Sequence, residues 1–233
     1  MSCAPWGPWG IGVFDTLRGF NINQQNPPNT SLALVSDAFF AKDDSNLVVT
    51  VRGAPGFVAI YPVEGNGQVS AMANDAIPSG IAASFGGVAV PKSSHIFVSE
   101  PRFGGYILDL EKPETPISTI TVPGQKAICW AAITSKFATG ILPDAGTSVI
   151  TQVDLLSGKI LQQWNSTNGN AGNLDFAISA DDKLYALAFN PADTQAWVAS
   201  FDVSGKFADI DNVAIAGTDM FSQGFAVYPT LGN

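Results

Sequence analysis

Charged residues are scarce in this chain, and positive ones are scarcest. Only 13% of its 233 residues are Asp, Glu, Lys or Arg, and 11 Lys and Arg stand against 20 Asp and Glu, for a net charge of −9. The positive residues are scattered along the chain and form no basic patch. A nucleic-acid partner is therefore not expected, because such partners require clustered positive charge.

Cysteine and histidine are almost absent. Two cysteines exclude a framework of several disulfides; a single bridge between Cys3 and Cys129 stays open, and a buried free thiol at Cys129 is favoured. One histidine, His95, cannot build a His/Cys zinc site, and no spacing matches a calcium loop. A nucleophile elbow, a P-loop and an H-E-x-x-H motif are also missing. We predict no metal and no cofactor.

Long apolar runs are lacking as well. None approaches the roughly 18 residues that a membrane helix requires, so no membrane span is predicted. The first residues, MSCAPWGPWGIGVFD, have neither the basic start nor the apolar stretch of a signal peptide. Either the protein is cytosolic or its true beginning is missing. Residues 1–35, rich in Pro, Gly, Asn and Gln, are interpreted as a mostly irregular segment.

What is present is a repeated pattern of apolar strands. Hydrophobic residues make up 46% of the chain, and the mean hydropathy is +0.19. Residues 124–146 (GQKAICWAAITSKFATGILPDAG) show an apolar run, a polar turn and a second apolar run, which predicts a β-hairpin. The same pattern recurs at 38–51, 88–99 and 176–188. Four hairpins of one kind indicate a repeat protein.

Each hairpin is followed by a third strand of similar pattern and then by an outer strand. Matching positions in the third strands recur at spacings of 47, 45 and 48 residues: Pro62, Asp109, Asp154 and Asp202. A period of about 40 to 50 residues with four strands per unit is typical of β-propeller blades. A β-sandwich, which also contains many short strands, is the less favoured alternative.

The chain is therefore predicted to be all-β, a propeller with about four complete four-stranded blades. Their approximate ranges are 36–78, 79–125, 126–170 and 171–219. Residues 220–233 are predicted to form a partial blade, with one extra strand from Met220 to Tyr228. The propeller thus looks incomplete. Unpaired sheet edges attract other strands, so self-association through open edges is expected.

The candidate site lies where the second strands end. In a propeller these connections surround the mouth of the central channel, and here they carry polar residues. We predict Glu100, Arg52 and Arg102 to be catalytic and Asp144 and Asn190 to bind substrate. Guanidinium groups can hold an anion, and a carboxylate can act as general acid or base. The alternative is structural, because Asp and Asn favour turns for local hydrogen bonding.

Two further sets of residues are assigned structural roles. His95 opens a second strand, on the face opposite the mouth, and is expected to be structural or merely exposed. Trp130, Trp164 and Trp197 fall on or beside predicted strands and are expected to belong to the core rather than to form ligand platforms.

Several segments resemble a known family. The sequences GQKAICWAAIT from Gly124, VAIYPVEGNGQVS from Val58, and the segment 17–53 resemble fungal 3-carboxymuconate cyclase-like or lactonase-like proteins. The resemblance covers about residues 17–229 and places this chain in the C-terminal portion of such a protein. It implies a seven-bladed propeller, often secreted, related to muconate lactonizing enzymes and 6-phosphogluconolactonases that work without a metal.

The family's active centre is only partly matched. In those relatives it uses His, Glu and Arg on one face, with the His just before an innermost strand. The matching positions here contain no histidine: Ser36, Asp37, Phe85, Gly86, Cys129, Asn173 and Ser222. The catalytic histidine therefore cannot be assigned in this chain.

Two functions are consistent with the sequence. The resemblance implies a lactonase or muconate cyclase-like propeller that opens or closes a lactone, without a metal, on a small carboxylated substrate. The alternative is a catalytically inactive secreted propeller glycoprotein or binding scaffold, or a truncated family member. An extracellular location is expected from the resemblance, and the acceptor sequences at Asn29 and Asn165 are then predicted to be glycosylated.

Overall fold

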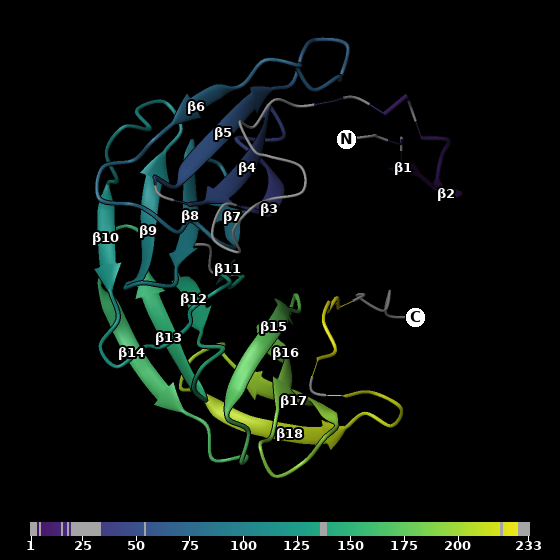
Figure 1. Ribbon diagram of the computed structural model, residues 1–233, viewed down its shortest axis with the longest axis vertical. Helices are drawn as coiled ribbons and strands as arrows, with labels where there is room; N and C mark the ends of the chain where they lie inside the picture. Colours follow the sequence, from purple (N-terminus) through teal and green to yellow (C-terminus); the bar gives the residue numbers. More distant parts are fainter. Residues whose placement is uncertain are drawn as a thin grey trace.

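The computed structural model (Figure 1) describes residues 4, 6–14, 16–17, 19, 34–53, 55–135, 139–219 and 221–227. Within these residues the chain is all-β, without a helix, and it contains eighteen strands. Sixteen of them form four separate four-stranded antiparallel sheets, each in the chain order of its strands. The predicted repeat of four-stranded blades is confirmed. No helix in the described part of the chain is long and apolar enough to cross a membrane.

The four sheets follow one another along the chain. The first contains β3 (Leu34–Ala41), β4 (Asn46–Arg52), β5 (Phe57–Pro62) and β6 (Asn74–Ala76). The second contains β7 (Gly87–Ala89), β8 (His95–Glu100), β9 (Gly104–Asp109) and β10 (Ser118–Thr121). The third contains β11 (Ala132–Ile133), β12 (Thr139–Pro143), β13 (Val149–Asp154) and β14 (Ile160–Asn165). The fourth contains β15 (Gly172–Ile178), β16 (Lys183–Phe189), β17 (Ala196–Asp202) and β18 (Ala208–Ala214).

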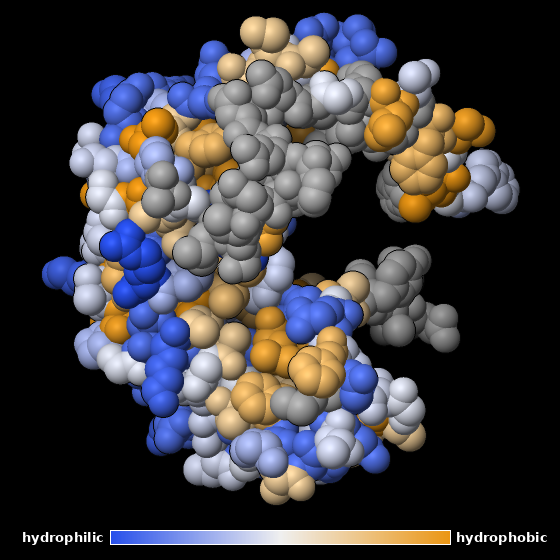
Figure 2. All heavy atoms as spheres, viewed as in Figure 1, coloured by the Kyte–Doolittle hydropathy of each residue, from blue (hydrophilic) through white to orange (hydrophobic). Residues whose placement is uncertain are grey.

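The sheets are arranged in an arc. In Figure 1 the first strands β3, β7, β11 and β15 lie along its inner side, and the last strands β6, β10, β14 and β18 along its outer side. Figure 2, seen from the same direction, shows hydrophilic residues over much of the outer rim, with hydrophobic ones scattered among them. Strand ends at the same end of each blade are thereby brought to one face, around the inner side of the arc.

The predicted register of the third strands is also seen. In every sheet the matching residue pairs with the first residue of the second strand; the pairs are Asn46 with Pro62, His95 with Asp109, Thr139 with Asp154 and Lys183 with Asp202. Asp109, Asp154 and Asp202 each accept the backbone N–H two residues further on. This local bond is the reason an aspartate suits the end of a third strand.

The core lies between neighbouring sheets. In β8 the consecutive residues Ile96, Phe97 and Val98 are all fully buried. Ile96 and Val98 pack into the cluster shared with the first sheet, whereas Phe97 packs into the cluster shared with the third. Successive side chains of a strand point to opposite faces, so a middle sheet must be apolar on both. This packing explains why so few residues are charged.

The structure corrects the prediction of one extra strand in a fifth blade. Residues 221–227 form no strand, although they lie on the open side of the arc beside β15 (Figure 1). The Asp175 carboxylate accepts the backbone N–H of Phe225, just as Asp37 in β3 accepts the N–H of Gly87 in β7 at 2.9 Å. The segment therefore runs where an innermost strand would start, but a strand also requires a pairing partner, and the described residues supply none.

The described residues of the N-terminal segment add no strand to any of the four sheets. Its strands β1 (Trp6–Gly7) and β2 (Gly10–Ile11) pair only with each other. Trp9, between them, is fully exposed, and Val13 is 90% exposed. The predicted self-association through open edges stays a prediction.

We predict that Phe97→Ala destabilises the fold strongly. The Phe97 ring is fully buried and occupies the space above Gly140, where an added Cβ would lie only 2.5 Å from a ring carbon. Removing a buried phenyl ring costs about 3–5 kcal/mol in the free energy of unfolding. Urea unfolding followed by circular dichroism measures this change. Leu156→Ala, at a residue 84% exposed, is the control and should change it by less than about 0.5 kcal/mol; equal effects would contradict the core assignment.

Candidate functional site

The structure brings two of the predicted catalytic residues together at one cavity. Arg52 ends β4 and Arg102 follows β8, and both line a cavity of about 400 Å³. The remaining lining residues are small or apolar: Gly53, Ala82, Ala83, Phe85 and Pro101. A volume of this size suits a small molecule. We call this space the mouth cavity.

Arg52 is the most distinctive group there. Its Cζ atom lies 4.9 Å from the centroid of the Phe85 ring, which places the guanidinium over the ring face. Its Nε atom is buried and has no hydrogen-bond partner among the described residues. A cation over an aromatic face is attracted by the ring quadrupole, by about 0.5–2 kcal/mol. That contact uses the face of the ring and does not occupy the N–H donors of the guanidinium.

Glu100 lies directly behind the cavity wall. It is fully buried, and its carboxylate accepts three backbone N–H groups: from Ala82 at 3.2 Å, Ala83 at 2.6 Å and Arg102 at 3.2 Å. These bonds hold the two loops that form opposite walls of the mouth cavity. The structure thus gives Glu100 a clear architectural role, and its predicted catalytic role stays a prediction.

Asp144 repeats this arrangement one blade further on. Its carboxylate accepts the backbone N–H groups of Lys126 at 2.8 Å, Ala127 at 2.9 Å and Gly146 at 2.8 Å. Asn190 closes its own turn by accepting the N–H of Ala192 at 3.0 Å. Neither residue lines the mouth cavity. Their predicted role in substrate binding stays a prediction, and the observed bonds are those of the structural alternative.

Phe85 and Trp130 are site residues that the sequence reasoning did not select. The two rings meet edge to face, with centroids 5.5 Å apart and planes at 87°. The Trp130 Nε1–H donates to the carbonyl of Leu174 in the fourth sheet at 3.0 Å. Trp130 was expected in the core, and it is partly buried. The sequence signal for Phe85 is its position just before an innermost strand.

Cys129 is a free thiol, as favoured by the sequence. Burial raises the pKa of Cys129 to about 11, the charge of Arg52 lowers it and the charge of Asp144 raises it. The Arg52 guanidinium is therefore close enough to act on a residue of the third blade. Cys3 lies outside the described residues.

Two aspartates of the innermost strands were also missed. Asp37 in β3 and Asp175 in β15 occupy matching positions, each at a register shift of its strand. Burial raises the pKa of Asp37, against hydrogen bonds from the N–H groups of Gly87 and Ala38, and the charge of Asp175 raises it further. Burial likewise raises the pKa of Asp175. In both strands an aspartate precedes a run of apolar residues, and that pattern is the signal that could have found them.

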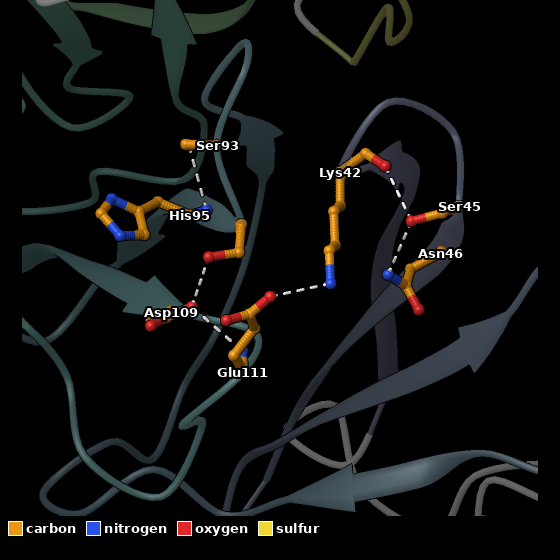
Figure 3. A network of polar contacts seen from close by, with 8 residues as sticks. Lys42, Ser45, Asn46, Ser93, His95, Asp109 and Glu111 are labelled. Atoms are coloured by element: carbon orange, nitrogen blue, oxygen red, sulfur yellow. Dashed lines mark hydrogen bonds and ion pairs between the residues drawn. The ribbon is translucent and has the colours of Figure 1, made fainter.

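His95 lies on the other face, as predicted. It begins β8, whereas Glu100 ends it, so roughly 16 Å of strand separates them at about 3.3 Å per residue. Figure 3 shows His95 beside Asp109 and pointing away from the Lys42–Glu111 ion pair, whose Nζ and Oε1 atoms are 2.9 Å apart. That pair joins the first two sheets. Within the described residues no three His, Cys, Asp or Glu side chains gather closely enough to hold a metal ion.

Comparisons with known proteins identify a fold rather than a family. No protein-family model matches the sequence, and no curated protein matches it. The structure is similar to hydrazine synthase of Kuenenia stuttgartiensis, with a TM-score of 0.65 and 14% identity over 86% of this chain and 53% of that one. It is also similar to a periplasmic gluconolactonase of Pseudomonas aeruginosa, with a TM-score of 0.59 and 16% identity over 78% of this chain and 57% of that one.

These likenesses support the lactonase-like propeller fold. At such low identities they show the fold alone. The chain spans a little more than half the length of the two solved chains that it matches.

We predict that Glu100→Gln destabilises the fold by disturbing the loops at the mouth cavity. A glutamine side chain has one acceptor oxygen, so at least one of the three N–H groups now bound by Glu100 loses its acceptor and faces an NH2 group. A buried unsatisfied donor costs about 1–3 kcal/mol, measurable as a lower free energy of unfolding. Glu111→Gln is the matched control, because its only ion pair is exposed and worth at most about 1 kcal/mol. If both variants unfold alike, the bonds to Glu100 do not stabilise the fold.

Proposed function

We propose that this protein is a lactonase-like propeller that binds a small carboxylated molecule in the mouth cavity and opens or closes a lactone there without a metal. The observation that carries the proposal is a pair of arginines, Arg52 and Arg102, that line one cavity. Neither of them forms an ion pair with another described residue. The net charge of −9 means that carboxylates outnumber positive groups, yet the described residues place none of them in an ion pair with these two arginines.

The chemistry of the cavity favours an anion. A guanidinium presents a rigid fork of donors that matches a carboxylate, and the bonds formed are charge-assisted. Arg52 is partly buried over Phe85, so its charge is less screened than that of a surface arginine. The apolar lining accommodates the carbon skeleton of the ligand.

The same arginines suit a lactone reaction. When water attacks the lactone carbonyl carbon, negative charge develops on the carbonyl oxygen before the ring C–O bond breaks, and a nearby guanidinium stabilises it. The attacking water gives a proton to a base, and the ring oxygen takes one up. Asp37 does not itself line the cavity, but its carboxylate accepts the N–H of Gly87, two residues beyond the lining residue Phe85. Asp37 is partly exposed and its pKa is raised. It is therefore a better proton acceptor than the fully buried Glu100.

The gluconolactonase among the solved structures is compatible with this proposal, but hydrazine synthase has the same fold. Membership of the fungal 3-carboxymuconate cyclase-like family likewise rests on the sequence segments that resemble it. The arginines of the mouth cavity, rather than the fold, therefore support the choice of a carboxylated substrate.

The second candidate is a binding scaffold without catalysis. Two observations favour it: the Glu100 carboxylate is occupied by backbone N–H groups, and His95 lies on the opposite face from the cavity. Such a protein would still hold a carboxylate at Arg52, so binding and turnover must be measured separately.

We also propose that the protein is secreted and glycosylated at Asn165. Asn165 is exposed at the end of β14, and its Oδ1 accepts the hydroxyl of Ser148 at 2.8 Å. Mass spectrometry of protein from its own cells should find glycan on Asn165, and Thr167→Ala should abolish it by removing the acceptor sequence. Secreted protein with unmodified Asn165 would contradict glycosylation there. Asn29, the other predicted acceptor, lies outside the described residues.

We predict that Arg52→Ala weakens binding of cis,cis-muconate, a small dicarboxylate probe, by about 10- to 100-fold. A hydrogen bond to a charged group contributes about 1.5–3 kcal/mol, and each 1.4 kcal/mol is tenfold in affinity. Titration calorimetry measures the affinity, and Arg102→Ala should also lower it. Lys159→Ala, which removes an exposed positive charge elsewhere, is the control and should leave the affinity unchanged.

Turnover is tested with the same variants by following muconolactone hydrolysis through proton release. Hydrolysis by the wild type that Arg52→Ala and Asp37→Asn both abolish supports the enzyme. Muconate binding without hydrolysis supports the scaffold instead. Absence of both in the wild type overturns the proposed function.

A further inference from the structure

We infer that Trp130 is a positioning residue, which holds the Arg52 guanidinium at the mouth cavity through Phe85. The inference rests on the proposed function for its meaning, because Arg52 is the proposed carboxylate-binding group. The geometry on which it depends is independent of any ligand.

Among the described residues, Arg52 is held in place by packing. Its guanidinium makes no hydrogen bond or ion pair within the described residues, and its Nε is buried. Within the described part of the chain, the contact that orients it is the face of the Phe85 ring, 4.9 Å from Cζ. An arginine side chain has several rotatable bonds and loses considerable rotamer freedom when fixed. The position of its charge therefore follows the position of the Phe85 ring.

The Phe85 ring is in turn oriented by Trp130. The backbone of Phe85 is anchored to the first sheet, because its carbonyl accepts the Thr50 hydroxyl at 2.6 Å. The ring extends from that anchor and meets Trp130 edge to face. Edge-to-face pairs have a preferred geometry beyond simple burial of area. Loss of the Trp130 ring would leave Phe85 free to tilt, and Arg52 would tilt with it.

Trp130 itself is fixed from two sides. Its Nε1–H donates to the carbonyl of Leu174, which ties it to the fourth sheet. On the other side the indole lies directly against Gly86, where an added Cβ would be 2.4 Å from Cε3 of Trp130. The backbone N–H of Gly86 also donates to the carbonyl of Cys129 at 2.8 Å. Only glycine leaves room for the indole in this position.

These contacts form one column across four blades: Arg52 from the first, Phe85 and Gly86 from the second, Trp130 from the third and Leu174 from the fourth. Because of this column, the position of the Arg52 guanidinium depends on how the four sheets are packed. A change two blades away from Arg52 should therefore alter anion binding without touching the cavity.

The experiment compares two tryptophans in an otherwise unchanged chain. Trp130→Leu removes the indole ring that meets Phe85 edge to face. Trp164→Leu removes a partly buried tryptophan that packs on Phe201 between the third and fourth sheets, away from the cavity. Both should lower the melting temperature. Only Trp130→Leu should weaken muconate binding, by roughly threefold to tenfold.

A double-mutant cycle separates positioning from a general loss of stability. If Trp130 acts through Arg52, Trp130→Leu should have almost no further effect on binding in the Arg52→Ala background. Trp130→Phe, which keeps a ring but loses the bond to Leu174, should lie between the wild type and Trp130→Leu. Equal binding by Trp130→Leu and Trp164→Leu, or full additivity in the cycle, overturns the inference.

A ligand-free readout keeps this result distinct from failure of the proposed function. Burial has the largest effect on the pKa of the Cys129 thiol and raises it, whereas the charge of Arg52 lowers it. The pH dependence of alkylation by iodoacetamide therefore responds to the position of the guanidinium: its loss raises the pKa, whereas exposure of the thiol would lower it. With Cys3→Ser in every variant, the pKa of Cys129 should rise in Arg52→Ala, should rise similarly in Trp130→Leu and should stay unchanged in Trp164→Leu. If the wild type binds no muconate, the proposed function fails, and this titration alone decides the inference: an unshifted pKa in Trp130→Leu overturns it.

Discussion

Face-to-face packing between neighbouring sheets is the interaction on which the rest of this structure depends. In β8 three consecutive side chains are fully buried, Ile96 and Val98 toward one neighbour and Phe97 toward the other. A sheet with two apolar faces gains its stability only when both are covered, at about 25 cal/mol per Å² of buried apolar surface. The sheets therefore stack around an axis. This stacking brings the end of the second strand of each sheet to the same face of the arc.

Acidic side chains near that mouth bind backbone N–H groups, and among the described residues none forms an ion pair with the arginines of the mouth cavity. Glu100 and Asp144 each accept three backbone N–H groups, which satisfies buried donors in connections that cannot form ladder bonds. A carboxylate that accepts backbone N–H groups does not pair with Arg52, whose guanidinium lies over the Phe85 ring instead. The structural demands of the blades thus leave two arginines at one cavity in an acidic protein, and this is the basis of the proposed anion binding.

Much of the fold could be read from the sequence because its signals are local. Alternation and polar turns predict hairpins, and the recurrence of Pro62, Asp109, Asp154 and Asp202 predicts the repeat, since each lies at the end of a third strand. The prediction of a strand in a fifth blade was wrong because it also depended on a local pattern alone. The pattern of residues 221–227 is that of a strand and its contact to Asp175 fits the position, but a strand is defined by pairing, which no single segment contains.

The sequence by itself determined the all-β class, the four-strand repeat and the residue types at the mouth, because these follow from neighbours close in the chain. Only the tertiary structure decided which of those residues meet. Arg52 and Arg102 line one cavity, whereas Asp144 and Asn190 bind backbone N–H groups of loops away from it. Trp130 touches Phe85 rather than merely filling the core. Contacting residues in adjacent blades are about one repeat apart in the chain. Their approach is set by the packing angle between sheets, which local patterns do not encode.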